Sequence, residues 1–132
     1  MKSYLIVALG GAIGSVARFW FSGLAARHWG GAFPWGTLAV NVIGSFIIGL
    51  VAGLAAVESR MWVSPTSRLF IMVGICGGFT TFSSFSLQTL NLARDGEWLR
   101  AGANILGSVA LCLVGVWAGY LVAAQLNSSK GL

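Results

Sequence analysis

Four long apolar segments, separated by short polar turns, fill nearly the whole of this 132-residue chain. A helix needs about 20 apolar residues to cross a bilayer, and each segment reaches that length. Hydrophobic residues make up 57% of the sequence and charged residues only 8%, whereas soluble domains carry about a quarter of their residues as charges. We therefore predict an all-α integral membrane protein, a single transmembrane domain over residues 1–132. Its four spans are expected at about 4–26, 36–57, 67–91 and 98–126.

The few polar and charged residues exclude several classes of function. The net charge is +5, but the basic residues occur singly and form no stripe for nucleic acid, so lipid head groups are the better partner. His28 is the only histidine and falls in a predicted loop, as do the acids Glu58, Asp95 and Glu97. These residues cannot form a zinc cluster or a histidine-based catalytic triad, so we expect no enzyme.

The stretch from Gly74 to Ser86 interrupts the third apolar segment. Three glycines and five hydroxyl residues in these thirteen positions are poor material for a continuous helix. In hydrocarbon, a broken backbone must be buried in protein or line a wet cavity, because unsatisfied amides are costly there. The third helix is therefore predicted to break near its middle. The residues after the break, Thr81, Phe82, Ser83, Ser84 and Phe85, then mark a permeation or binding site.

Phe82 and Phe85 are three residues apart and would share one helix face. Aromatic residues in membrane helices usually pack against other helices or face lipid. Here the alternative is electrostatic, since ring edges are positive and can face an anion. Conduction requires sites that attract an ion without trapping it, and ring edges beside hydroxyl groups meet that requirement.

Arg18 is the only charge well inside a predicted span. A charge at the bilayer centre costs roughly 2.5–3.5 kcal/mol on insertion scales, so such residues usually face protein or water. Arg18 could reach the interface by snorkelling, or it could supply a fixed positive charge at a pore mouth.

Residues 1–17 loosely fit a cleaved signal peptide, but three equally apolar segments follow them.

Two further sets of polar residues lie within predicted spans. Asn41 in the second span could join helices by a hydrogen bond, or its amide could donate to an anion in a pore. Asn104, Ser108 and Cys112 are spaced four apart on the fourth span and form one line on a helix face. That line fits interhelical hydrogen bonding as well as a second polar track.

Small-residue pairs predict close helix packing in two places. Gly10 with Gly14 in the first span, and Gly115 with Gly119 in the fourth, form the small-xxx-small pattern that lets membrane helices approach closely.

The loop charges give almost no orientation signal. With four spans, Lys2, Arg60, Arg68 and Lys130 fall on one side of the membrane, and Arg27, Arg94 and Arg100 on the other, joined by Arg18 if it reaches that interface. Such a chain could insert both ways and form an antiparallel homodimer. The alternative is a weakly biased protein with one orientation.

Two other function classes fit a chain of this size. A small proton-coupled multidrug transporter also has four spans, but its mechanism needs an acidic residue in the first span, and this chain has none there. A non-conducting membrane assembly subunit would use the polar residues only to pack helices. Anion flux through the purified protein distinguishes these alternatives from a channel.

Three motifs resemble one known family. Gly14-Ser-Val-Ala-Arg18, Gly36-Thr-Leu-Ala-Val-Asn41-Val-Ile-Gly44 and Gly77-Gly-Phe-Thr-Thr-Phe-Ser-Ser-Phe85 together are similar to the Fluc (CrcB-like) fluoride channels. The resemblance covers all four spans. It implies a fluoride-selective channel that passively exports cytoplasmic fluoride across a bacterial inner membrane. It also implies an antiparallel, dual-topology homodimer with two pores.

The resemblance also implies roles for individual residues. Arg18 would lie near an aqueous vestibule, and Asn41, Phe82 and Phe85 would line the pore. The hydroxyls of Thr81, Ser83, Ser84 and Ser108 would extend a polar track. The helix break would offer the carbonyl oxygens of Gly77 and Thr80 from both subunits to a structural sodium ion, a hard cation that suits oxygen ligands. Ser84 replaces a threonine common in the family, and Asn104 and Cys112 occupy variable positions without an assigned role.

Overall fold

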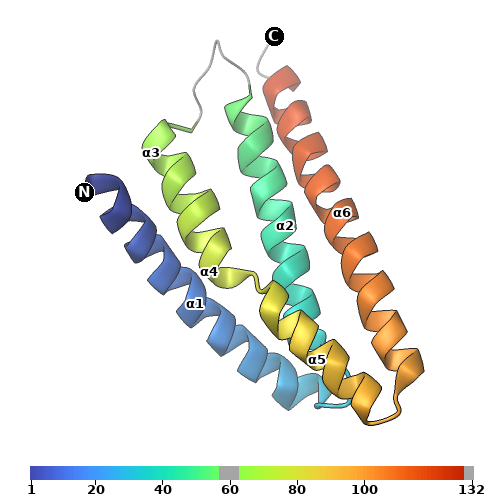
Figure 1. Cartoon of the computed structure of the whole chain (residues 1–132). Helices are drawn as coiled ribbons and strands as arrows, with labels where there is room; N and C mark the ends of the chain where they lie inside the picture. The colour runs from blue at the N-terminus through green and yellow to red at the C-terminus, as the bar shows by residue number, and fades with distance from the viewer. Residues whose placement is uncertain (57–62, 130–132) are drawn as a thin grey trace.

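The computed structural model describes residues 1–56 and 63–129, which form helices joined by short connections (Figure 1). The elements are α1 (Lys2–Trp29), α2 (Trp35–Ala55), α3 (Pro65–Arg68), the π-helix η1 (Leu69–Cys76), α4 (Gly77–Phe79), α5 (Phe82–Arg94) and α6 (Trp98–Ser129). Glu58, Arg60 and Lys130 lie outside the described residues.

Four helical segments are long and apolar enough to cross a membrane: Lys2–Trp29, Trp35–Ala55, Pro65–Arg94 and Trp98–Ser129. The prediction of an all-helical, four-span, multi-pass membrane protein is confirmed. The start of α1 and the end of α6 lie toward one end of the bundle, and the α1–α2 and α5–α6 connections lie at the other (Figure 1).

The helix ends follow local signals in the sequence. Gly30 has φ +74°, a conformation that side chains rarely adopt, and it ends α1. The predicted loop position of His28 is therefore wrong, because α1 continues through its last turn and His28 Nδ1 lies 3.0 Å from the Leu24 carbonyl oxygen. Pro65 occupies the first turn of α3 behind the Ser64 cap.

The turn between α5 and α6 also contains a glycine with a positive φ. Gly96 has φ +77°, its N–H donates to the Ala93 carbonyl, and the Glu97 N–H donates to the Leu92 carbonyl. This pair of hydrogen bonds is the Schellman arrangement that satisfies the last carbonyls of a helix. The turn brings α6 back alongside α5.

Glycines bring two pairs of helices into backbone contact. A Cβ atom at Gly14 would overlap the Ile75 carbonyl oxygen, and one at Gly10 would come within 2.9 Å of the Gly74 Cα, so α1 packs directly on η1. A Cβ atom at Gly119 would overlap the Phe46 carbonyl oxygen, so α6 packs directly on α2. Both predicted small-residue pairs therefore lie at close helix contacts, as the pattern indicated.

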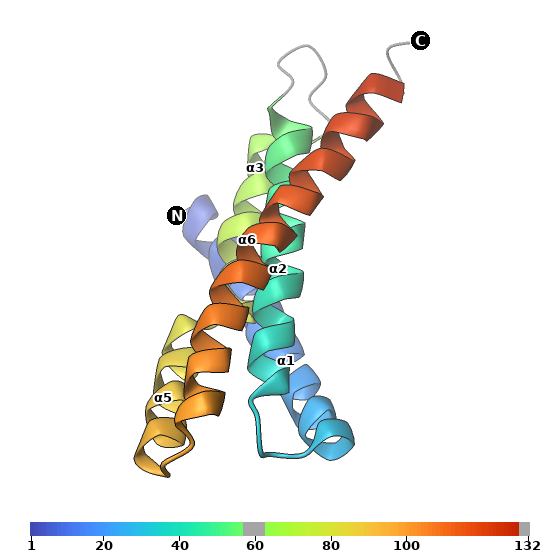
Figure 2. The same cartoon turned by 90° about the vertical axis from the view of Figure 1, so that its right-hand side faces the viewer.

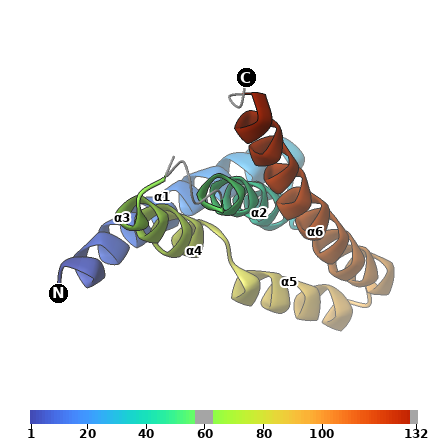
Figure 3. The ribbon, with the colours of Figure 1, turned by 90° about the horizontal axis from the view of Figure 1, so that it is seen from above.

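Thr80 and Thr81 have extended backbones and separate α4 from α5. As a result α5 leaves the line of α4 and runs beside the first half of α6 (Figures 2 and 3). Immediately before this point, η1 is a π-helix of eight residues, a geometry that the sequence pattern did not indicate. π-helical turns are rare and are frequently found at functional sites, and among the described elements only the third segment contains one.

Candidate functional site

A cavity of about 370 Å³ lies between α2, α5 and α6, beside the two extended residues. It collects five of the residues that the sequence placed in a pore: Asn41, Thr81, Phe82, Phe85 and Ser108. The rest of its wall consists of Gly44, Ser45, Ile48, Thr80, Val109, Cys112 and Leu113.

Asn41 holds the extended segment through both ends of its side-chain amide. Its Oδ1 accepts a hydrogen bond from the Thr81 N–H at 2.7 Å, and its Nδ2 donates to the Thr81 carbonyl at 3.1 Å. An extended residue between two helices cannot form the usual i to i−4 bonds, and unsatisfied groups are costly in hydrocarbon. Asn41 therefore satisfies the Thr81 backbone and joins α2 to the third segment.

One turn further along α2, Gly44 leaves room for the extended segment. A Cβ atom at Gly44 would overlap Cγ2 of Thr80. Asn41 and Gly44 thus lie about one turn apart on α2, where Asn41 supplies hydrogen bonds and Gly44 leaves space for the Thr80 side chain. The sequence motif contains both residues, but their shared target, Thr80 with Thr81, depends on the tertiary fold.

The Thr81 side chain caps the start of α5. Its Oγ1 accepts from the Ser84 N–H at 3.2 Å and donates to the Ser84 hydroxyl at 3.1 Å, and the Ser83 hydroxyl lies 3.3 Å away. Such a cap satisfies one of the free N–H groups in the first turn. Ser83 and Ser84 therefore lie around the Thr81 hydroxyl and outside the cavity wall.

The hydroxyl groups in the cavity wall all donate their protons to acceptors of this chain. A hydroxyl has one proton to donate, so in this arrangement the oxygens present lone pairs to the cavity. The acceptors are Cys76 O for Thr80 (2.8 Å), Asn41 O for Ser45 (2.7 Å), Ser84 Oγ for Thr81 (3.1 Å) and Asn104 Oδ1 for Ser108 (3.3 Å).

What remains for an anion is a small set of weak donors. Asn41 Nδ2 carries a second N–H that makes no hydrogen bond to the described part of the chain. The Phe82 and Phe85 rings both line the cavity, with centroids 5.2 Å apart and planes tilted by 45°, and the edge of such a ring is positive. Phe85 is 9% exposed and Phe82 is 76% exposed, so the cavity is open on the Phe82 side.

The extended segment also leaves two carbonyl groups without their helical partners. In a continuous helix the Gly77 carbonyl would accept from the Thr81 N–H and the Thr80 carbonyl from the Ser84 N–H. Here those N–H groups donate to Asn41 and to the Thr81 hydroxyl instead. No cluster of three or more His, Cys, Asp or Glu residues that could hold a metal ion occurs in residues 1–56 and 63–129.

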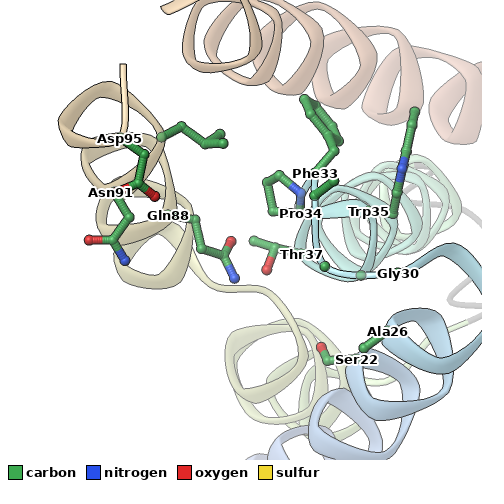
Figure 4. Close-up of a pocket in the computed structure, with 14 residues that line it drawn as sticks. Ser22, Ala26, Gly30, Phe33, Pro34, Trp35, Thr37, Gln88, Asn91 and Asp95 are labelled. Carbon is green, nitrogen blue, oxygen red and sulfur yellow. The ribbon is translucent and has the colours of Figure 1, made fainter. Parts of the chain in front are cut away.

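A second cavity, of about 300 Å³, lies at the end of the bundle that carries the α1–α2 and α5–α6 connections. Figure 4 shows Gln88 and Asn91 of α5, with Asp95 just after its end, on one side of it, and Phe33, Pro34, Trp35 and Thr37 on the other. Ser22 contributes from α1, and Arg18 lies one turn before Ser22. Arg18 is half-buried, and its Nε finds no hydrogen-bond partner among the described residues.

Sequence reasoning missed several residues of these sites. Ser45 and Gly44 line the main cavity, and Gln88 lines the second one. Ser45 could have been found, because it follows Asn41 by four residues and must share its helix face. Gln88 had no such signal, because Ser84, four residues before it on α5, lines neither cavity.

Comparisons with known proteins agree on one family. A sequence model described as "CrcB-like protein, Camphor Resistance (CrcB)" matches residues 5–120. A protein of Opitutus terrae with the name "Fluoride-specific ion channel FluC" is 65% identical over 131 residues, which cover 99% of each chain. Proteins with the same name from Methylocella silvestris and Paramagnetospirillum magneticum are 56% and 58% identical, and the alignments cover at least 96% of each chain.

Proposed function

Because the chain belongs to the CrcB-like family of fluoride channels and is not an enzyme, we propose that it conducts fluoride selectively and passively through the cavity beside Thr81. The resemblance predicted from the three motifs is thereby confirmed at the level of the family. The proposed role is export of cytoplasmic fluoride across a bacterial inner membrane, which prevents toxic accumulation of the anion.

The observation that carries this proposal is the set of donors that the cavity offers. One free N–H of Asn41 and the edges of two phenylalanine rings attract a small anion, but they bind it weakly. The wall hydroxyls can help only by turning away from acceptors that they already have. Weak, multiple sites let an ion enter and leave, whereas a strong anion-binding pocket would hold it.

We propose that the conducting unit is an antiparallel homodimer. One chain does not enclose the cavity, because Phe82 lines it and still keeps 76% of its surface exposed. A second copy facing Phe82 would close this side. The nearly equal numbers of basic residues that the sequence predicts on the two sides of the membrane allow both orientations of the chain.

A structural sodium ion between the two subunits fits the same backbone. The Gly77 and Thr80 carbonyls lack their helical N–H partners, and a Cβ atom at Gly77 would meet nothing within 4 Å, so space remains beside it. Oxygen donors without a carboxylate suit a hard monovalent cation. Two carbonyls from each chain would supply four oxygens, and the bound ion would neutralise their partial charge at the dimer axis.

We assign the second cavity as the aqueous vestibule of the pore. Arg18 lies one turn from its wall, and the positive charge of this half-buried residue would raise the local concentration of anions there. Gln88 and Asn91 add polar groups that can hold water. In this assignment Arg18 attracts fluoride to the entrance and takes no part in selectivity.

Proteoliposomes loaded with fluoride or with chloride test the proposal. We expect the purified protein to release fluoride rapidly and to retain chloride, as the name of its relatives, fluoride-specific ion channel, suggests. An ion-selective electrode measures each release against protein-free liposomes. Equal release of both anions would contradict selectivity, and release of neither would favour a non-conducting assembly subunit.

A further inference from the structure

Behind the main cavity, Asn104 forms a buried polar network that joins α6 to α5. The Asn104 side chain is 1% exposed, and it is absent from the cavity wall. Its Nδ2 donates to the Thr89 hydroxyl at 2.9 Å, and its Oδ1 accepts from the Ser108 hydroxyl at 3.3 Å. A buried amide with both ends hydrogen-bonded fixes the groups around it.

The direction of these hydrogen bonds follows from Thr89. Its hydroxyl proton is donated to the Phe85 carbonyl at 2.7 Å, so its oxygen can only accept from Asn104. The amide nitrogen of Asn104 must therefore face Thr89, and the amide oxygen must face Ser108. Ser108 is then the donor, and its single proton is directed away from the cavity.

The network also determines where α5 lies. Phe85 is the only described residue of α5 that is buried. Among the described residues, the hydrogen bond from Asn104 to Thr89 is the polar side-chain contact between α5 and α6. Since Thr89 is bonded to the Phe85 carbonyl, this contact lies one turn from the ring in the cavity wall.

We propose that Asn104 is a positioning residue for conduction: it fixes the Phe85 half-helix through Thr89 and holds the Ser108 proton away from the passing anion. The proposal rests on the fluoride conduction proposed above. Asn104 never touches the ion in this account. It sets where one wall of the cavity stands, and it keeps Ser108 a weak site.

Two near-isosteric substitutions separate the two arms of the network. Asn104→Leu removes both hydrogen bonds of the amide, whereas Thr89→Val removes the one to α5 together with the bond from Thr89 to the Phe85 carbonyl. Both variants can fold, because Leu and Val are apolar and of similar size to the residues they replace, and the Ser108 hydroxyl can turn to the cavity that it lines. Asn127→Leu is the matched control on the same helix, since Asn127 donates to the Gly53 carbonyl far from the cavity.

Fluoride release from proteoliposomes is measured over a series of fluoride concentrations for wild type and each variant. We expect Asn104→Leu and Thr89→Val each to lower the maximal rate about tenfold, the factor that about 1.4 kcal/mol makes in a rate. The double variant should be no slower than Asn104→Leu, because the two residues form one bond. Thr89→Ser should recover much of the rate lost in Thr89→Val, and Asn127→Leu should conduct like wild type.

The concentration of fluoride at half-maximal rate tests the Ser108 arm. It should fall severalfold in Asn104→Leu, where the Ser108 proton is released to bind fluoride more tightly, and stay unchanged in Thr89→Val. An unchanged value in Asn104→Leu would overturn that arm, and wild-type rates in both variants would overturn the positioning role. A wild-type protein that released no fluoride would instead contradict the proposed function.

Discussion

Replacing Asn41 with leucine is expected to reduce fluoride flux at least about a hundredfold, which corresponds to about 2.7 kcal/mol in the barrier. The substitution removes both hydrogen bonds to the Thr81 backbone. It also removes the one free N–H that faces the cavity. Each unsatisfied buried group costs about 1–3 kcal/mol, so the extended segment should move to find other partners, and the cavity wall would move with it.

Hydrogen exchange separates the two roles of Asn41. The Thr81 N–H donates to Asn41 in the wild type. Its hydrogen exchange should therefore accelerate in Asn41→Leu if the two hydrogen bonds from Asn41 hold the extended backbone of Thr80 and Thr81 in place. Asn127→Leu again provides a control that loses an amide elsewhere. Loss of flux with unchanged Thr81 exchange would restrict Asn41 to direct contact with the ion. Wild-type flux would remove it from the pore altogether.

A valine at Gly119 should prevent the chain from folding into its bundle. Its Cβ atom would overlap the Phe46 carbonyl oxygen, and a Cβ atom at Gly49 would overlap the Val116 carbonyl in the same interface. Carbonyl groups inside helices cannot move aside as a flexible side chain can. Overpacking typically costs about 1–3 kcal/mol, and a β-branched residue against backbone should reach or exceed the upper end.

Gly102→Val is the matched control, because a Cβ atom at Gly102 would meet nothing within 4 Å on the same helix. The yield of monodisperse protein by size exclusion and the thermal unfolding midpoint in detergent measure the effect. We expect Gly102→Val to behave like wild type and Gly119→Val to aggregate. Equal stability of the two variants would show that α2 and α6 do not pack as closely as the structure has them.

The sequence predicted the spans well, because hydropathy and length determine them directly. Three of the helical segments extend over the predicted ranges, whereas α2 ends at Ala55 and the predicted end of the second span, residue 57, lies outside the described residues. Helix α1 continues past His28 and ends at Gly30, and the third segment begins at Pro65, before the apolar run. The contacts at Gly14 and Gly119 were also predictable, since the small-xxx-small spacing is local to one helix.

The details of the site were less accessible, because they depend on residues far apart in the chain. Asn41 and Thr81 are 40 residues apart, and no local pattern shows that one holds the backbone of the other. Asn104 lay on a predicted polar line with Ser108, but its partner Thr89 belongs to a different helix. The π-helix before Gly77 has no sequence signal that we could use.

The central claim is that fluoride passes through the cavity between α2, α5 and α6, and Cys112 offers a direct test. Its thiol lines that cavity, whereas Cys76 is 2% exposed, so a bulky thiol reagent added to the folded protein should modify Cys112. Fluoride release from liposomes is then measured with protein whose modification is verified by mass. The account predicts that modified protein loses most of its fluoride flux, while Cys112→Ser treated in the same way conducts normally. Unchanged flux through fully modified protein would contradict it.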